Sequence, residues 1–307
     1  MKKIACILAT VCLLAGCGQS YEEKQRLTRQ QRLQMQREDS AALKVAVMPT
    51  MDCLPLYVAQ ERGFFKAQGV DVRLKRFTAQ MDCDTAIARG RVEGLVSDLV
   101  RTERLQPGTP LRYVASTNAY WQLITRRSAR IRELKELDDK MVAMTRFSAT
   151  DMLTDRVVDS VKLDRDRVFK VQINDVSIRL LMLQNNEMDA LWMSEPWATA
   201  ARTLKNAVVY DTQKEDLRLG VVVFREKEMQ HPERSQQLAL LVKAWNQACD
   251  SINKYGVRYY RNLIVQRCKV KNNLMDSLPD RVRYEHVVGP RQKEVEMAEK
   301  WLKTKGK

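Results

Sequence analysis

Histidine and closely spaced cysteine pairs are scarce in this chain of 307 residues. The only histidines are His231 and His286, and none of the seven cysteines belongs to a Cys-x-x-Cys pair. Histidine and cysteine are common ligands of zinc, and histidine is the usual acid–base group near neutral pH. Their scarcity argues against a metal site and against histidine-dependent catalysis, and we expect no cofactor.

A second absence concerns the membrane, because no segment after the N-terminal run is apolar enough to span a bilayer. The chain begins with the basic Met1-Lys2-Lys3 and an apolar run over residues 4–14. A basic start, a short apolar run and a small-residue cleavage site are typical of a secretory signal. Leu14-Ala15-Gly16-Cys17 resembles a bacterial lipobox, so we predict a lipoprotein signal peptide over residues 1–16 and a lipid anchor such as palmitate on Cys17. The alternative is an ordinary signal that happens to contain a cysteine.

Large apolar side chains are also scarce in residues 17–41, which are crowded with Gln, Arg and Glu. Such a composition cannot bury a core. We predict a polar tether, helical in part, between the lipid and a folded domain. A coiled-coil partner site is the alternative, but Leu27, Leu33 and Met35 do not sustain a heptad.

Positive charge is abundant but not concentrated in one block. The formal net charge is +15, and Lys and Arg are spread along the whole chain without a recognised nucleic-acid motif. We therefore expect no nucleic-acid partner. Attraction to anionic lipid surfaces, or a mild preference for anionic solutes, explains the charge more simply.

Four cysteines remain after the signal and Cys17. An even number in an oxidising compartment suggests disulfides, but four cysteines allow three pairings. Met51-Asp52-Cys53 and Met81-Asp82-Cys83 repeat one tripeptide at two predicted turns, so we predict a disulfide between Cys53 and Cys83. Cys249 and Cys268 fall on successive predicted helices, where buried free thiols are an equal alternative.

The first part of the folded domain alternates strands and helices. Residues 44–49 are a short apolar run closed by a proline, which indicates a buried strand. Asp52 is a candidate N-cap for a helix that Pro55 favours at its first turn and that Gly63 ends. Further strands are predicted at residues 70–74, 95–97, 111–115 and 122–125, with a helix over 82–88. This is the α/β pattern.

A second lobe repeats this scheme. It has predicted strands at 141–144 and 169–173 around a helix over 152–161, and residues 180–192 echo residues 85–96. We expect the strand over 219–224 to return to the first lobe, followed by helices over 232–255, 258–267 and 291–303. The predicted architecture is therefore α/β, with lobe 1 at 42–122 plus 218–307, lobe 2 at 123–217 and two hinge crossings.

Two motifs resemble one known family. The residues from Leu54 to Val72, LPLYVAQERGFFKAQGVDV, are similar to the opening of the NMT1/THI5-like substrate-binding proteins of nitrate, taurine, sulfonate and thiamine-precursor importers. Ser194-Glu195-Pro196-Trp197 resembles the Glu-Pro-Trp turn of the same family. The resemblance spans residues 44–305. It implies a type II periplasmic binding protein fold, in which two lobes close around a ligand.

Polar residues at the ends of predicted strands are the candidate ligand-binding residues. They are Thr50, Asp52, Cys53, Thr78, Asp82, Ser97, Asp98, Thr117, Trp121, Ser148, Thr150, Glu195 and Trp197. Ser148, Ala149 and Thr150 are the best candidates for an anion, since hydroxyls and free N–H groups converge at the start of a helix. The carboxylates among them would repel a bare anion, so a cationic or hydrogen-bond-donating solute is expected if they face the cleft.

Several of these residues have a structural alternative. Asp52 can serve as an N-cap, Glu195 can cap the following helix, and Trp197 can pack in the core. Thr117, Tyr120 and Trp121 lie near the first crossing, where an aromatic residue can be a hinge-packing residue. Thr78 and Asp82 can lie in a surface loop.

The resemblance predicts a monomeric lipoprotein of the cell envelope, facing the periplasm or the exterior, that delivers a small polar organic solute to an ABC permease and its ATPase. One alternative is a sensor or binding lipoprotein without transport. Another is an enzyme on the same fold, which predicted export and the missing cleft histidine disfavour. The sequence does not name the solute.

Overall fold

The computed structural model describes residues 29–279 and 282–306. The predicted signal peptide over residues 1–16 and the lipidated Cys17 lie outside the described residues. The chain divides into two units, residues 1–42 and residues 43–307. Of the first unit, the structure describes α2 (Arg29–Ala41), a polar helix in which Leu33 and Met35 are exposed. The tether function of residues 17–41 stays a prediction.

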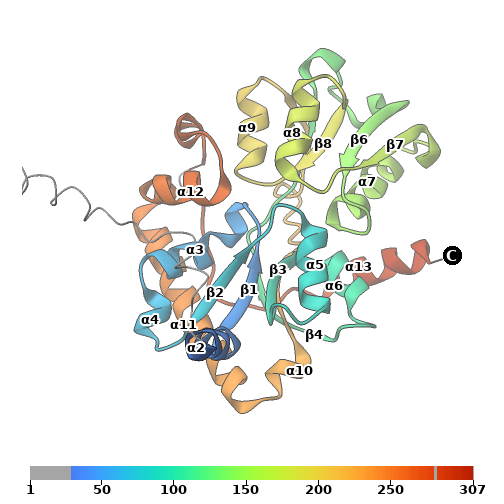
Figure 1. Ribbon diagram of the computed structural model, residues 1–307. Helices are drawn as coiled ribbons and strands as arrows, with labels where there is room; N and C mark the ends of the chain where they lie inside the picture. Colours follow the sequence, from blue (N-terminus) through green and yellow to red (C-terminus); the bar gives the residue numbers. More distant parts are fainter. Residues whose placement is uncertain (1–28, 280–281, 307) are drawn as a thin grey trace, which may run out of the picture. The chain divides into compact units, whose positions relative to one another are not determined.

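Residues 43–307 contain two five-stranded sheets with the same strand arrangement (Figure 1). The order is β2-β1-β3-β10-β4 in the first sheet and β7-β6-β8-β5-β9 in the second. In each sheet three strands run parallel, and the strand between the third and the edge runs antiparallel to both neighbours. The α/β fold class predicted from the sequence is confirmed. We refer to the part built on the first sheet as lobe 1 and to the part built on the second as lobe 2.

The strands of lobe 1 are β1 (Leu43–Val47), β2 (Val72–Arg76), β3 (Gly94–Asp98), β4 (Leu111–Ser116) and β10 (Gly220–Arg225); those of lobe 2 are β5 (Gln122–Thr125), β6 (Lys140–Met144), β7 (Val168–Gln172), β8 (Ala190–Met193) and β9 (Ala207–Asp211). The α-helices of the second unit are α3 (Leu54–Glu61), α4 (Phe64–Ala67), α5 (Gln80–Ala88), α6 (Leu99–Leu105), α7 (Ala149–Ser160), α8 (Val176–Gln184), α9 (Trp197–Thr203), α10 (Glu226–Met229), α11 (Pro232–Tyr255), α12 (Arg261–Cys268) and α13 (Gln292–Lys305). Short 3₁₀ helices are η1 (Met51–Cys53), η2 (Arg127–Ala129), η3 (Leu134–Leu137), η4 (Arg165–Arg167), η5 (Val257–Tyr260) and η6 (Asn272–Asp276).

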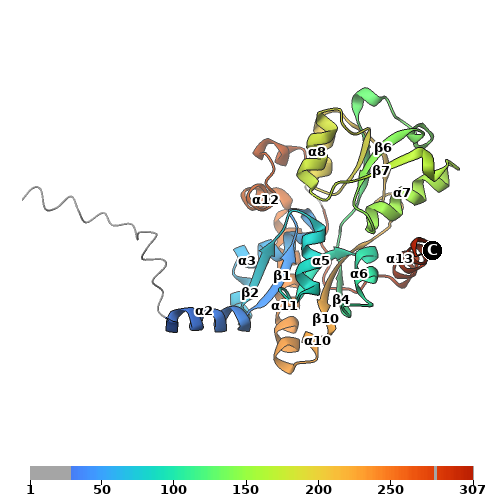
Figure 2. The same ribbon diagram turned by 45° about the vertical axis from the view of Figure 1, so that its right-hand side comes forward.

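The central strands are apolar on both faces because helices cover both sides of each sheet (Figures 1 and 2). All five residues of β3 are buried, as are the first five of β10. Gly94 in β3 lies opposite Phe224 in β10, and a Cβ at Gly94 would meet the Phe224 ring at 2.6 Å. Glycine is therefore required where these two strands approach.

Two short crossings join the lobes, one between β4 and β5 and one between β9 and β10. The crossings bond to each other, since Trp121 N–H donates to Thr212 Oγ1 at 2.9 Å and Thr212 N–H donates to Trp121 O at 3.0 Å. The expected return of residues 219–224 to the first sheet is confirmed by β10, which pairs with β3 and β4. The lobe boundaries predicted from the sequence stay a prediction.

The C-terminal helix α13 forms a further link between the lobes. It packs mainly against α6 of lobe 1 and also contacts α7 of lobe 2. Trp301 Nε1 of α13 donates to Asp155 Oδ2 of α7 at 2.8 Å, and Lys305 Nζ pairs with the same oxygen at 2.6 Å. The Asp155 side chain is 2% exposed, so α13 is fastened to lobe 2 through a buried carboxylate.

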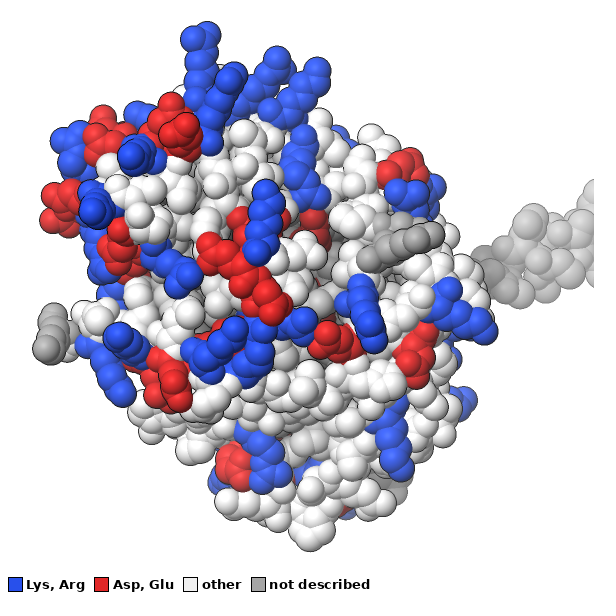
Figure 3. All heavy atoms as spheres, turned by 180° about the vertical axis from the view of Figure 1, so that it is seen from behind, with Lys and Arg blue, Asp and Glu red and all other residues white. Residues whose placement is uncertain are grey.

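In the described residues, no helix combines the length and the apolar character that a membrane span needs. Seen from behind, the surface carries basic and acidic side chains interspersed with one another (Figure 3). The net charge of +15 is therefore not gathered in one block on this face.

Candidate ligand-binding cleft

Two cavities lie where the lobes meet, and they share Asp52 and Ser194 in their walls. The larger has a volume of about 410 Å³ and the smaller a volume of about 80 Å³. Both contain residues from lobe 1 and from lobe 2. A solute that occupied either cavity would therefore touch both lobes.

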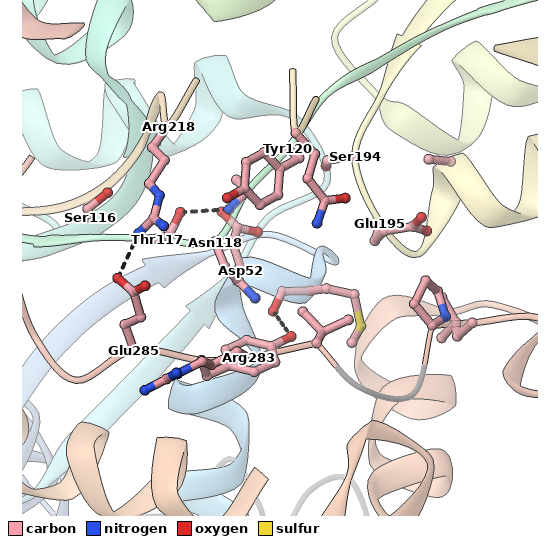
Figure 4. A pocket seen from close by; sticks show the side chains of 18 of the residues that line it. Asp52, Ser116, Thr117, Asn118, Tyr120, Ser194, Glu195, Arg218, Arg283 and Glu285 are labelled. Carbon is pink, nitrogen blue, oxygen red and sulfur yellow. Dashed lines mark hydrogen bonds and ion pairs between the residues drawn. The ribbon is translucent and has the colours of Figure 1, made fainter. Parts of the chain in front are cut away.

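The larger cavity is bordered by the two crossings, the β8–α9 turn and a C-terminal segment, as Figure 4 shows. The end of β4 and the first crossing supply residues 116–120. The turn supplies Ser194 and Glu195, and the C-terminal segment supplies Leu278, Pro279 and residues 282–285. Arg218, from the second crossing, pairs with Glu285 through Nη1 and Oε2 at 2.7 Å and with Asp216 at 3.3 Å. The Arg218 charge is thus neutralised by two carboxylates.

Asp52 lies at the junction of the two cavities. The predicted N-cap role of Asp52 is wrong, because residues 51–53 form the turn η1 ahead of α3 and no side chain caps α3. No Lys or Arg of the described residues forms an ion pair with Asp52. Burial raises the pKa of the Asp52 carboxyl, and a hydrogen bond from Thr50 opposes this shift only in part. Asp52 is therefore a carboxylate at the cavity without a cationic partner in this part of the chain.

The smaller cavity holds Asp98, which ends β3 and caps α6. Its Oδ1 accepts the Arg101 N–H at 3.0 Å within lobe 1 and the Ala149 N–H at 2.9 Å from α7 of lobe 2. Burial raises the pKa of the Asp98 carboxyl to about 6, against the opposing charge of Arg101. The carboxylate thus lies between the starts of two helices and links the lobes.

The N–H groups at the start of α7 are already occupied, contrary to the expectation that they are free. Ala149 N–H donates to Asp98, and Thr150 N–H donates to Ser148 Oγ at 3.1 Å. The Ser148 hydroxyl in turn donates to Thr145 O at 2.7 Å. The predicted anion site is therefore filled by the protein's own groups.

Arg179 of α8 also lines the smaller cavity, and the sequence-based prediction missed it. It is 3% exposed, and its guanidinium donates to Ile173 O, Trp192 O and Thr145 Oγ1. Burial lowers the pKa of Arg179 to about 10. The signal available in the sequence was a single arginine just before the apolar Leu180-Leu181-Met182-Leu183 run of a helix.

The cavities contain most, but not all, of the predicted site residues. Those in the smaller cavity are Thr50, Asp52, Ser97, Asp98, Trp121, Ser148 and Thr150; those in the larger are Asp52, Thr117 and Glu195. Cys53, Thr78, Asp82 and Trp197 line neither. Cys53 and Trp197 are buried, and Thr78 and Asp82 are exposed. Tyr120, which was considered only near the hinge, also lines the larger cavity. The prediction missed Trp245 of α11, and it missed Tyr284 and the other residues of the C-terminal segment.

The Glu-Pro-Trp turn joins the lobes rather than only facing the cleft. Met51 N–H donates to Glu195 O, and Trp197 Nε1 donates to Pro49 O, each at 2.9 Å. The Glu195 carboxylate lines the larger cavity, accepts the Thr199 N–H of α9 at 3.0 Å and pairs with Arg202 at 2.8 Å. The alternatives of a helix-capping Glu195 and a buried Trp197 are thus both confirmed.

The predicted disulfide between Cys53 and Cys83 is absent. Both are buried free thiols, as are Cys249 and Cys268. Cys53 Sγ lies 3.4 Å from Met48 N, whose N–H it accepts, and 3.8 Å from Thr50 Oγ1. Burial raises the pKa of the Cys53 and Cys83 thiols. Each thiol packs separately in the core of lobe 1. The repeated tripeptide therefore does not indicate that the two cysteines are close together.

The Asp98 carboxyl should make stability depend on pH. The pKa of Asp98 in the folded state, about 6, lies above its ordinary value of 3.8. As pH falls, Asp98 is therefore protonated in the folded state before it is protonated in the unfolded state, and keeping it charged in the folded state lowers the free energy of unfolding. The free energy of unfolding should therefore rise by about 1 kcal/mol as pH falls from 7 to 5. The Asp98→Asn variant keeps an Oδ1 acceptor and should lose this component. Urea unfolding of both proteins at several pH values measures it, and parallel curves would contradict the assignment.

No group of three or more His, Cys, Asp or Glu side chains in the described ranges is placed to hold a metal ion. The walls of the larger cavity supply carboxylates, guanidiniums, amides, hydroxyls and aromatic rings. This arrangement can bind a small organic molecule through hydrogen bonds, charge and stacking.

A family model described as NMT1/THI5 like matches residues 50–283. The alkanesulfonate-binding protein SsuA from Xanthomonas axonopodis pv. citri, solved bound to MOPS, has a TM-score of 0.71 at 14% identity, and the match covers 86% of this chain and 92% of that one. The nitrate-binding protein NrtA from Synechocystis PCC 6803 has a TM-score of 0.66 at 15% identity, and the match covers 76% of this chain and 68% of that one. The desulfurization enzyme DSZB has a TM-score of 0.64 at 13% identity, and the match covers 86% of this chain and 92% of that one. No curated protein sequence matches the chain. Likeness at such identities shows the fold alone.

Proposed function

Since this chain belongs to the NMT1/THI5-like family, we propose that it is an extracytoplasmic solute-binding protein that delivers a small polar organic solute to an ABC importer. The observation that carries this proposal is the cavity of about 410 Å³, whose walls come from both lobes and from both crossings. A binding protein of this kind needs a site that exists only when its lobes are together.

The crossings supply the mechanism. The two short connections, residues 117–121 and 212–219, are the hinges about which we expect the lobes to rotate. The solute shifts the equilibrium because it binds the closed form better than the open form. Asp98, Glu195 and Trp197 make bonds across the cleft that favour closure once the solute has filled the cavity.

The cellular setting follows from the N-terminal segment. Removal of residues 1–16 leaves Cys17 as the first residue, and a lipid on Cys17 holds the domain at the membrane surface. Residues 17–41 give the domain reach toward a permease and its ATPase. In this proposal the protein acts as a monomer, and the closed form is what the permease recognises.

Binding, rather than catalysis, suits the cleft. The described residues that line it include no histidine, so the commonest acid–base group is missing from the described side chains that would meet the solute. DSZB has a similar fold, but a similar fold does not imply the same activity.

A panel of amines, pyrimidines, sulfonates and nitrate tests the proposal by thermal shift. A solute at 100 times its Kd stabilises the folded state by about 2.7 kcal/mol, which raises Tm by roughly 5 °C for a protein of this size. Native mass spectra of protein purified without denaturation should also show a co-purified solute. No shift and no bound mass would count against a solute receptor.

A bulky residue at the junction of the cavities provides the control. Ser194→Trp should abolish the thermal shift because the indole fills the space shared by both cavities. Thr203→Trp places the same side chain at an exposed position of α9 and should leave the shift unchanged. Loss of the shift in both variants would point to a general effect on folding.

A further inference from the structure

Of the carboxylates in the wall of the larger cavity, one has no ion pair with a described residue. Of the three carboxylates in the larger cavity, Glu195 pairs with Arg202 and Glu285 pairs with Arg218. Asp52 has no such partner among the described residues. A negative charge of this kind in a partly buried wall is unfavourable until a cation neutralises it.

The start of α7 argues against an anionic solute. A helix N-terminus ordinarily attracts anions, but here the Ala149 N–H is taken by the Asp98 carboxylate at 2.9 Å. An incoming anion would have to displace a carboxylate that also caps α6 through Arg101. The protein thus fills with its own side chain the place that a nitrate or sulfonate group would use.

The remaining cations do not change this balance. The guanidinium of Arg179 is already bonded to Ile173 O, Trp192 O and Thr145 Oγ1, and the carboxylate that acts on its charge is Asp175. Arg283 is exposed at the edge of the larger cavity. It can meet an acidic group at the far end of a longer solute, so zwitterions remain within the class.

Aromatic side chains complete the wall. Tyr120, Trp245 and Tyr284 all line the larger cavity, and aromatic faces attract cations. Trp245 is 3% exposed, and its Nε1 has no hydrogen-bond partner among the described residues. This N–H is enclosed by the protein and is not exposed to the cavity, so it is the ring of Trp245 that is available to a solute.

We propose that the solute is an organic cation or zwitterion whose protonated nitrogen pairs with Asp52. This proposal rests on the solute-binding function proposed above and names the solute class. Asp52 is then the specificity-determining residue of the cleft, and Asp98 is the residue that excludes small anions.

Thermal shift and calorimetry of the purified protein test this with three sets of probes. The cations are agmatine and butylammonium, the zwitterion is γ-aminobutyrate, and the anions are ethanesulfonate and nitrate. At least one cation or zwitterion should bind. Asp52→Asn should weaken it by about 10- to 100-fold, since hydrogen bonds to charged groups contribute about 1.5–3 kcal/mol.

Two variants separate charge from folding. Asp82→Asn removes an exposed carboxylate that lines neither cavity, and it should leave binding unchanged. Asp52→Glu keeps the charge and should retain more affinity than Asp52→Asn. Binding of the cation should also weaken as pH falls and Asp52 is protonated.

The outcomes distinguish the two proposals. Binding of ethanesulfonate or nitrate alone, or cation binding that Asp52→Asn does not weaken, would overturn the solute class and leave the receptor function intact. If none of the three sets binds and no co-purified mass is found, the receptor function itself fails and the solute class fails with it.

Discussion

Replacing Asp155 with alanine should lower the free energy of unfolding by about 3–5 kcal/mol, the usual loss when one partner of a buried ion pair is removed. Its carboxylate is 2% exposed and accepts bonds from Lys170 Nζ at 2.8 Å, Trp301 Nε1 at 2.8 Å and Lys305 Nζ at 2.6 Å. The alanine variant leaves the Lys305 ammonium and the Trp301 N–H without this acceptor, and Lys170 keeps Asp151 alone. Urea unfolding at pH 7 measures the loss.

The neighbouring Asp159 provides the control. It is half exposed and pairs with Arg165 on the same surface, so Asp159→Ala should cost less than about 1 kcal/mol. Equal effects of the two substitutions would contradict the role of Asp155. Limited proteolysis should also show residues 292–305 becoming accessible in Asp155→Ala, because α13 loses its attachment to lobe 2.

The same carboxylate should contribute to acid sensitivity. The pKa of Asp155 is lowered because bonds from Lys170, Lys305 and Trp301 outweigh its burial. A carboxyl with a lowered folded pKa stabilises the protein above its ordinary value of 3.8, and this stabilisation is lost as pH falls through the folded pKa. Asp155 and Asp98 thus act with opposite sign, since protonation of Asp98 occurs near pH 6 and favours folding.

The sequence was sufficient for the fold because the buried strands are written as short apolar, β-branched runs. The apolar run over residues 219–224 predicted the strand that the structure shows as β10, which returns to the first sheet as expected. The helix over residues 232–255 was recovered to the residue, since Pro232 and Gly256 mark its ends. The predicted helix over 258–267 was less accurate, because its first turn is the 3₁₀ helix η5.

The sequence predicted mainly those cleft residues that lie at the ends of strands. Thr50 follows β1, and Ser97 and Asp98 end β3. These strands are parallel and their carboxyl ends meet at one edge of the sheet, which is why the order of strands in the sequence located these residues. The segment over 278–285 lacks any periodic pattern, and only the folded chain brings Trp245 and Tyr284 to the same cavity. Residue order also gave no hint that Asp98 of lobe 1 would occupy the start of a lobe 2 helix.

Replacing Trp197 with alanine should lower the free energy of unfolding by about 3–5 kcal/mol, as is usual for a buried tryptophan. Trp197 is 8% exposed, and its Nε1 donates across the cleft to Pro49 O at 2.9 Å. The milder Trp197→Phe keeps most of the apolar contact and removes the donor. Its effect should fall mainly on lobe closure, because opening lets water reach the Pro49 carbonyl and the closed form does not.

Trp192→Phe is the matched control for closure. Trp192 is fully buried, and its Nε1 donates to Thr154 Oγ1 at 2.9 Å within lobe 2, so the variant loses the same kind of bond without touching the cleft. Leaving a buried carbonyl unpaired costs about 1–3 kcal/mol, and this cost on the closed form weakens solute binding by roughly 5- to 150-fold. Trp197→Phe should therefore bind its solute more weakly and scatter X-rays as a more open molecule, whereas Trp192→Phe should lose stability and keep its affinity. Equal affinities for the two variants would mean that the Trp197–Pro49 bond does not hold the lobes together.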